Sequence, residues 1–179
     1  MRAKSGKTGR LYTPSLSTRV PNMVTLGISM NTRLLGLAII KQGAFVDYSI
    51  RLHKSSWSPS KVTEIITSLE PCVRQYCIKR VVLSIPYVHH QTEAFKQLIS
   101  GIREYFEEKN IPVYAMPPEA LHSLYPPEQK KTKKVLMKLL TLQYPQLSYC
   151  YQKEMRNKNK YYIKLFEAVA VASLHERDK

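Results

Sequence analysis

Acidic residues are scarce in this sequence relative to basic ones. Thirteen Asp and Glu residues stand against 28 Lys and Arg, which gives a formal net charge of +15 over 179 residues. A charge excess of this size attracts polyanions from beyond contact distance, and the polyanions that proteins meet are nucleic acids and anionic membrane surfaces. The composition therefore predicts a partner of one of these two kinds.

Cysteine, glycine and long apolar runs are also in short supply. The three cysteines lack the spacing of a metal site, and so low a number predicts a reducing compartment, here the cytoplasm. The six glycines form no glycine-rich phosphate loop. No apolar run approaches the roughly 20 residues that span a bilayer, so we expect no integral membrane protein. Hydrophobic residues still make up 44% of the chain, which is enough for one packed domain.

Residues 1–22 differ from the rest of the chain. This segment holds five basic residues, no acidic residue and no hydrophobic periodicity, so it predicts a disordered basic arm. The remaining residues, 23–179, are expected to form one domain. This domain still carries a large positive charge without the arm.

The first part of the domain alternates apolar and small or polar residues with a period of two, which is typical of strands. Strands are predicted at 24–30, 34–40 and 44–52. Asn31-Thr32 and Gln42-Gly43 are short turn signals between them. Three strands with such tight connections predict an antiparallel meander.

After residue 52 the pattern changes to alternating helices and strands. Ser58 and Pro59 have the residue types of a helix start, and Pro71 predicts a kink or break in that helix. Residues 146–160 show no hydrophobic periodicity and are predicted to form a loop without helical structure. The further predicted elements are a helix at 59–76, a strand at 80–88, a helix at 92–109, a strand at 111–116, and helices at 131–143 and 161–175. This order predicts an α/β fold with a five-stranded mixed sheet, three strands antiparallel and the rest joined by parallel crossovers, with helices on both faces.

Four segments in this order resemble one family. They are LGIS at 26–29 with TRLLGLA at 32–38, VVLSIPY at 81–87, the segment 114–124 with KKTKKVLMKLL at 130–140, and EAVAVASLH at 167–175. Together they resemble the RuvC-type Holliday-junction resolvases and their YqgF-type relatives, which have a ribonuclease H-like fold. The resemblance covers residues 24–175 and implies that fold for the domain.

The resemblance also implies where catalytic acids should lie. Enzymes of this family cut phosphodiesters with divalent metals held by carboxylates. At the matching positions this chain has Ser29 on the first strand, Ser84 on the fourth strand, and Lys164 one turn before Glu167 on the last helix. Glu167 is the one acid retained, so the resemblance implies a degenerate active site with no metal and no cofactor.

Two alternatives remain open at this stage. The first is an active Mg- or Mn-dependent endonuclease or Holliday-junction resolvase, in which Glu119, Glu167 and Asp47 would hold one metal. The absence of a first-strand acid argues against it, because Mg²⁺ requires anionic oxygen ligands. The second alternative is a protein–protein scaffold built on a degenerate nuclease fold. His89 and His90 are interpreted as loop residues, since neighbours on an extended segment point to opposite faces.

Two basic clusters indicate how the chain would contact its partner. Lysines gather at the start of the predicted helix 131–143, and a second run of cations alternates with tyrosines after it. Such patterns suit contacts to phosphates and stacking on unpaired bases. We therefore expect a nucleic-acid-binding protein without cleavage activity, with structured DNA or RNA as partner, no membrane partner, and a homodimer left open. The predicted phosphate contacts are Lys130, Lys131, Lys133, Lys134, Arg156, Lys158 and Lys160.

Overall fold

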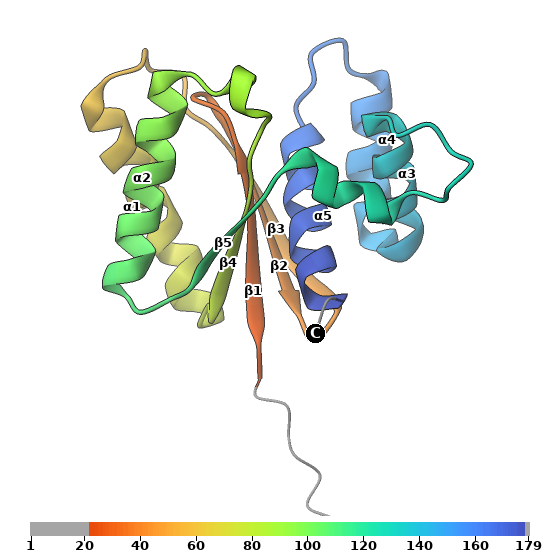
Figure 1. The fold of residues 1–179 in the computed structure, drawn as a ribbon, viewed down its shortest axis with the longest axis horizontal. Helices are drawn as coiled ribbons and strands as arrows, with labels where there is room; N and C mark the ends of the chain where they lie inside the picture. Colours follow the sequence, from red (N-terminus) through yellow and green to blue (C-terminus); the bar gives the residue numbers. More distant parts are fainter. Residues whose placement is uncertain (1–21, 178–179) are drawn as a thin grey trace, which may run out of the picture.

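The computed structural model describes residues 22–177. Apart from Asn22, the predicted basic arm at 1–22 lies outside these residues. Within them the chain forms a five-stranded sheet with the strand order β3-β2-β1-β4-β5 (Figure 1). None of the helices within this range is both long enough and apolar enough to cross a bilayer.

The meander predicted for the first three strands is confirmed. It consists of β1 (Val24–Met30), β2 (Leu34–Lys41) and β3 (Ala44–Leu52), paired antiparallel. The side chain of Asn31 forms the first turn by accepting hydrogen bonds from the amides of Arg33 and Leu34 at 2.8 and 2.7 Å. The second turn places Gln42 and Gly43 at φ 52° and 77°, the left-handed region that two-residue hairpins require.

The other two strands pair in parallel, as expected from the helical crossovers. β4 (Arg80–Ser84) lies beside β1, and β5 (Val113–Met116) lies beside β4. Both strands are shorter than predicted, because proline cannot donate a ladder hydrogen bond. Pro86 follows β4, and Pro112 precedes β5. The mixed five-stranded sheet is nevertheless the one that the sequence predicts.

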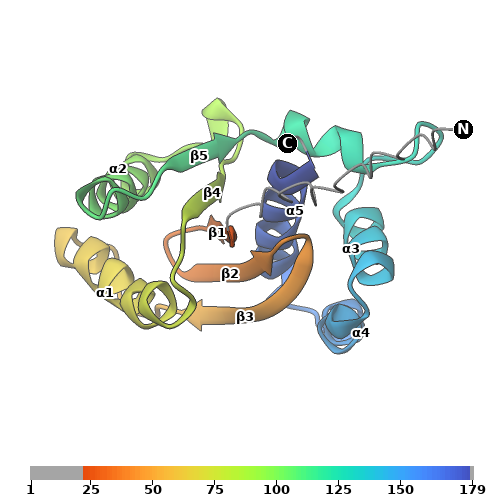
Figure 2. The ribbon, with the colours of Figure 1, turned by 90° about the horizontal axis from the view of Figure 1, so that it is seen from below.

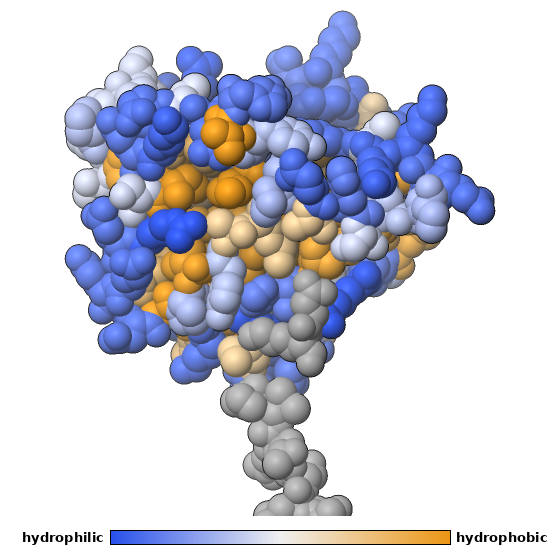
Figure 3. Space-filling view, viewed as in Figure 1, coloured by the Kyte–Doolittle hydropathy of each residue, from blue (hydrophilic) through white to orange (hydrophobic). Residues whose placement is uncertain are grey.

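Helices cover both faces of the sheet (Figure 2). One face carries α1 (Pro59–Tyr76) and α2 (Glu93–Glu108), and the other carries α3 (Lys133–Gln143), α4 (Ser148–Arg156) and α5 (Ile163–Arg177). Short 3₁₀ turns η1 (Val88–His90), η2 (Pro118–Leu124) and η3 (Pro145–Leu147) connect these elements. Figure 3 shows hydrophobic residues along the middle of one face, bordered by hydrophilic residues.

The first helix spans Pro59–Tyr76 as predicted, and it does not break at Pro71. Another prediction about helices is wrong. The segment 146–160 is not a loop, because most of it forms η3 and α4. In α4 and the turn before it, Leu147, Cys150 and Glu154 are fully buried. Their spacing of three and four residues is helical, but a buried acid in the third place obscures the apolar pattern.

Candidate functional site

The candidate site lies at the carboxyl ends of β1 and β4. These strands are parallel neighbours, and their register pairs Ser29 with Ser84. The period of two along β1 turns Ser29 toward α5, as it does Gly27, whose Cα faces Ala168 of that helix. Ligands of open α/β sheets bind outside the carboxyl ends of parallel strands, so this is the expected place for a site.

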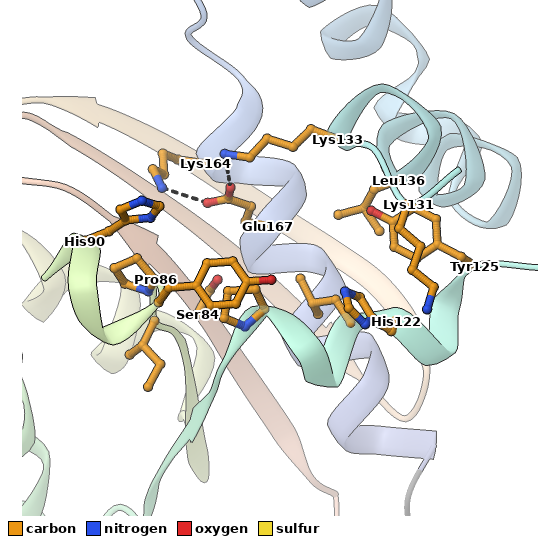
Figure 4. Close-up of a pocket in the computed structure, with 14 residues that line it drawn as sticks. Ser84, Pro86, His90, His122, Tyr125, Lys131, Lys133, Leu136, Lys164 and Glu167 are labelled. Carbon is orange, nitrogen blue, oxygen red and sulfur yellow. Dashed lines mark hydrogen bonds and ion pairs between the residues drawn. The ribbon is translucent and has the colours of Figure 1, made fainter. Parts of the chain in front are cut away.

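Glu167 is the centre of the site, and three donors surround it. Its carboxylate accepts a hydrogen bond from the Ser29 hydroxyl at 2.7 Å. The Lys164 ammonium lies 2.7 Å from the same oxygen, and the Lys133 ammonium lies 3.0 Å from the other. Figure 4 shows both lysine side chains reaching toward the carboxylate from α5 and from the start of α3. Glu167 itself is only 9% exposed.

These contacts keep Glu167 ionised. Burial by itself raises the pKa of a carboxyl group, because it removes water from the charged form. The positive charges of Lys164 and Lys133, with the hydrogen bonds from Lys164 and Ser29, outweigh this effect and lower the pKa of Glu167 below its ordinary value of 4.5. The site therefore contains a compensated ion cluster at neutral pH.

The residues of the site do not fit a divalent metal. Mg²⁺ is bound by hard oxygen ligands, mostly carboxylates. Here a single carboxylate is present, and three of its roughly four acceptor positions already serve two ammonium groups and a hydroxyl. Within residues 22–177 no three His, Cys, Asp or Glu side chains come together in a way that could hold a metal ion.

The acids of the nuclease alternative do not converge. Asp47 pairs with Ile39 on β2, whose side chain belongs to the core under α1, and its carboxylate accepts a hydrogen bond from Tyr76 of α1. Glu167 lies on the opposite face of the sheet, on α5. Glu119 belongs to η2 and is exposed. The prediction that these three acids could hold one metal is therefore wrong, because a β-bulge between Phe45 and Asp47 turns Asp47 to the other face.

A pocket of about 340 Å³ adjoins Glu167. It opens between β4, η1, η2 and the first turns of α3 and α5 (Figure 4). Its lining combines cations, aromatic rings and apolar side chains. The lining residues are Ser84, Ile85, Pro86, Tyr87, His90, Pro118, Leu121, His122, Tyr125, Lys131, Lys133, Leu136, Lys164 and Glu167.

The predicted phosphate-contacting residues fall into two groups. Lys130, Lys131, Lys133 and Lys134 are all exposed at the start of α3, where the Thr132 hydroxyl accepts the hydrogen bond that caps the helix. Two members of this group, Lys131 and Lys133, line the pocket.

The second group is exposed at the end of α4 and in the connection to α5. It consists of Arg156, Lys158 and Lys160. Lys160 donates a hydrogen bond to the carbonyl of Glu154 at 3.1 Å, which ties this connection to α4. The connection lies at the same end of the molecule as η1 (Figure 1).

The sequence did not identify the aromatic residues of the pocket. Tyr87 and His90 come from η1 and the residue before it, while His122 and Tyr125 come from η2 and the residue after it. These short turns carry no periodic pattern, so periodicity does not place them together. One signal was available, since loops after the carboxyl ends of β4 and β5 must meet at this edge of the sheet.

A second cavity of about 640 Å³ lies near the opposite ends of these strands. Arg80 and Glu176 form a buried ion pair there at 3.2 Å. The Thr25 hydroxyl donates to Glu176 at 2.8 Å and accepts from Arg80 at 2.6 Å. This network links β1, β4 and α5.

Comparison with known proteins identifies the fold. No protein-family model and no curated protein matches the sequence. A structure of Thermus thermophilus RuvC in complex with a Holliday junction substrate is similar at 15% identity, with a TM-score of 0.66 over 86% of this chain and 92% of that one. A second Thermus thermophilus RuvC structure matches at 15% identity with a TM-score of 0.65, covering 86% and 93%. The chain thus has the ribonuclease H-like fold of RuvC, as predicted.

Proposed function

We propose that this RuvC-fold protein binds structured DNA or RNA and does not cleave it. The observation that carries the proposal is the state of Glu167, whose carboxylate is held by Lys164, Lys133 and Ser29. Ammonium groups here repel a divalent cation but attract a phosphate. The cluster therefore favours binding of a nucleic-acid backbone over metal-dependent hydrolysis.

The distribution of charge supports the binding half of the proposal. The chain has a net charge of +15, and lysines at the start of α3 and after α4 are exposed. Backbone contacts by Lys and Arg supply most of the affinity in sequence-independent binding. The Thermus thermophilus protein with this fold is described with a Holliday junction substrate, which supports a branched or otherwise structured partner for this chain.

The binding experiment uses the purified full chain with labelled four-way junction, duplex and single strands of DNA and RNA. We expect binding at about 50 mM salt that weakens steeply as salt rises, with a slope of about −0.9 per duplex phosphate contacted. Replacing Lys130 and Lys134 by Gln is expected to reduce the slope by about one for each phosphate that is no longer bound. Lys79→Gln, which removes an exposed charge before β4, is the control. If no nucleic acid binds at low salt, the scaffold alternative replaces the proposal.

The cleavage experiment adds Mg²⁺ or Mn²⁺ to the same substrates. We expect intact substrates, because the site offers one compensated carboxylate. Cleavage that disappears in Glu167→Gln would contradict the proposal and favour the nuclease alternative. Light scattering on the same samples measures the molar mass and decides between a monomer and the homodimer that the proposal leaves open.

A double variant that adds carboxylates tests whether the residues at the site are what prevents metal binding. Ser29→Asp combined with Lys164→Asp places two carboxylates beside Glu167. Like charges in a buried site destabilise it, so we expect a lower melting temperature without metal and a recovery with Mn²⁺. The wild-type protein is expected to melt at the same temperature with and without Mn²⁺. A stabilisation of the wild-type protein by Mn²⁺ would show that its own residues do bind the metal.

A further inference from the structure

The pocket beside Glu167 brings together two kinds of side chain that recognise different parts of a nucleotide. Three lysines line it, from the start of α3 and from α5, and aromatic rings line it from η1 and from the end of η2 (Figure 4). Phosphates bind ammonium groups, and unpaired bases stack on aromatic rings. This juxtaposition is not needed for the surface binding described above, where the lysines alone suffice.

The lysines keep donors for a ligand. An ammonium group has three N–H donors, and Lys133 and Lys164 each direct one toward Glu167. Lys131 forms no ion pair with the described part of the chain and is exposed. Counting three lysines against the single Glu167, the lining carries two excess positive charges when the histidines are neutral. Glu167 thus holds two ammonium groups in place without cancelling the positive charge of the pocket.

The aromatic side chains, with Ser84, form the remainder of the polar lining. Tyr87 is 38% exposed, and its ring stacks on His89 with centroids 5.7 Å apart and meets His90 edge-on at 6.1 Å. The Tyr125 hydroxyl donates to the carbonyl of Thr132 at 3.1 Å, which fixes that ring next to the start of α3. Burial and the charge of Glu167 raise the pKa of Tyr125, so its hydroxyl stays neutral at physiological pH.

The size of the pocket limits the ligand. A volume of about 340 Å³ is near the lower end of the range of small-molecule sites, about 300–1,000 Å³. This volume suits a single nucleotide and is too small for a base pair. A nucleotide that enters must therefore have left its partner strand or lie in a single-stranded segment.

We propose that this pocket binds one unpaired nucleotide of a nucleic-acid strand. Its phosphate lies against Lys133 and Lys164, and its base contacts Tyr87 and His90. Lys131, at the Tyr125 end of the pocket, contacts the neighbouring phosphate of the strand (Figure 4). The inference rests on the proposed function, since the exposed lysines around the pocket supply the contacts to the rest of the strand. It adds a preference for unpaired nucleotides at a junction, bulge or end, with no dependence on a metal.

The test compares binding of a short single strand and of a blunt duplex of the same sequence, in chelator, by fluorescence anisotropy. Tyr87→Ser is expected to weaken single-strand binding by about 5- to 150-fold, the range for loss of one base stack, and to leave duplex binding unchanged. Lys131→Gln is expected to reduce the salt slope for the single strand by about 0.7, the value for one phosphate contact in a single strand. Adenosine monophosphate is expected to compete with the strand at lower concentrations than adenosine or inorganic phosphate. It alone of the three can contact both the lysines and the aromatic rings of the pocket.

Controls separate this inference from the proposed function. Lys79→Gln removes an equal charge outside the pocket and is expected to bind both probes like the wild-type protein. Tyr87 and Lys131 are exposed, so their variants should fold, and thermal melting checks this. If the wild-type protein binds nucleic acid but Tyr87→Ser and Lys131→Gln bind the single strand equally well, the pocket assignment is overturned while the proposed function stands. If no nucleic acid binds, both fail.

Discussion

At the scale of single residues, Glu167 determines what the candidate site can do. It is a buried carboxylate that retains its charge because Lys164, Lys133 and Ser29 surround it. Its lowered pKa means that its contribution to stability is present above the ordinary pKa of 4.5. That contribution is lost as the pH falls through the still lower pKa of the folded state.

Glu167→Gln tests this compensation. The amide cannot balance two ammonium groups, so we expect the free energy of unfolding at pH 7 to fall by about 1–3 kcal/mol. This loss is smaller than the loss expected when a fully buried ion pair is broken, because the Lys133 side chain is 68% exposed. Urea unfolding at a series of pH values measures it, and the difference from the wild-type protein should shrink as the wild-type carboxylate becomes protonated in acid.

Glu119→Gln is the matched control, since Glu119 is exposed on η2. We expect a change within about 0.5 kcal/mol, as for most surface substitutions. If Glu119→Gln and Glu167→Gln lowered the free energy of unfolding equally, the cluster around Glu167 would contribute nothing specific to stability.

At the scale of elements, α1 shows how tertiary packing overrides a local signal. Pro71 lies inside this 18-residue helix, and it removes one backbone hydrogen bond. The helix continues beyond it because Cys72 and Val73 are buried against the sheet. Burial of these side chains offsets the local cost of the proline.

Pro71→Ala is therefore expected to stabilise the protein by about 1–2 kcal/mol. The gain from a regular helix is about 3 kcal/mol, and the loss of proline rigidity in the unfolded chain reduces it. Pro71 is exposed, so alanine leaves no buried cavity. Urea unfolding measures the change. Pro59→Ala, at the first turn of the same helix, is the control and should leave stability nearly unchanged, because proline is tolerated there. A lower stability of the Pro71→Ala protein would contradict the prediction.

The connection between α4 and α5 depends on a buried acid. One carboxylate oxygen of Glu154 accepts hydrogen bonds from the amides of Tyr161 and Tyr162 at 3.0 and 2.9 Å. These amides precede α5, which starts at Ile163. Glu154 thus joins two helices whose connection carries the exposed Lys158 and Lys160.

Glu154→Leu should lower the free energy of unfolding by about 1–3 kcal/mol, because the two amides lose their acceptor. Glu154→Gln retains an acceptor oxygen and should lower the free energy of unfolding less than Glu154→Leu does. Chemical denaturation of both variants measures the difference. If Gln were as damaging as Leu, the negative charge of Glu154 rather than its hydrogen bonds would be the important property.

At the scale of the whole molecule, α5 joins the sheet to the site. Residues Leu165 to Leu174 are all buried. The helix can approach the strands closely because two of the strand residues that face it are glycines. A Cβ at Gly27 would lie 2.0 Å from the carbonyl oxygen of Ala168, and one at Gly36 would lie 2.3 Å from the carbonyl carbon of Lys164.

Gly27→Ala is expected to destabilise the protein by about 3 kcal/mol or more, since the clash is with backbone rather than with a flexible side chain. Thermal melting measures the effect. Gly101→Ala in α2 is the control, because its new methyl group would meet only the ends of the Val62 and Ile66 side chains. A Gly27→Ala protein that melts like the wild type would refute the close packing of α5 on β1.

The sequence by itself predicted the mixed sheet and most helices and strands, and its resemblance to the RuvC-type resolvases implied the four positions that meet at the site, Ser29, Ser84, Lys164 and Glu167. Periodicity and turn residues are local properties, so they can be read along the chain. The sequence failed where a buried Glu154 interrupted the apolar stripe of α4, and it left open whether the first helix would break at Pro71.

Only the tertiary structure decided how the charges of the site pair and what surrounds them. Lys133 reaches Glu167 from a different helix, and Tyr87 and Tyr125 reach the pocket from turns after different strands. A β-bulge between Phe45 and Asp47 also turns Asp47 to the opposite face of the sheet. Contacts of this kind depend on the order of strands and on the docking of α5, which no local pattern specifies.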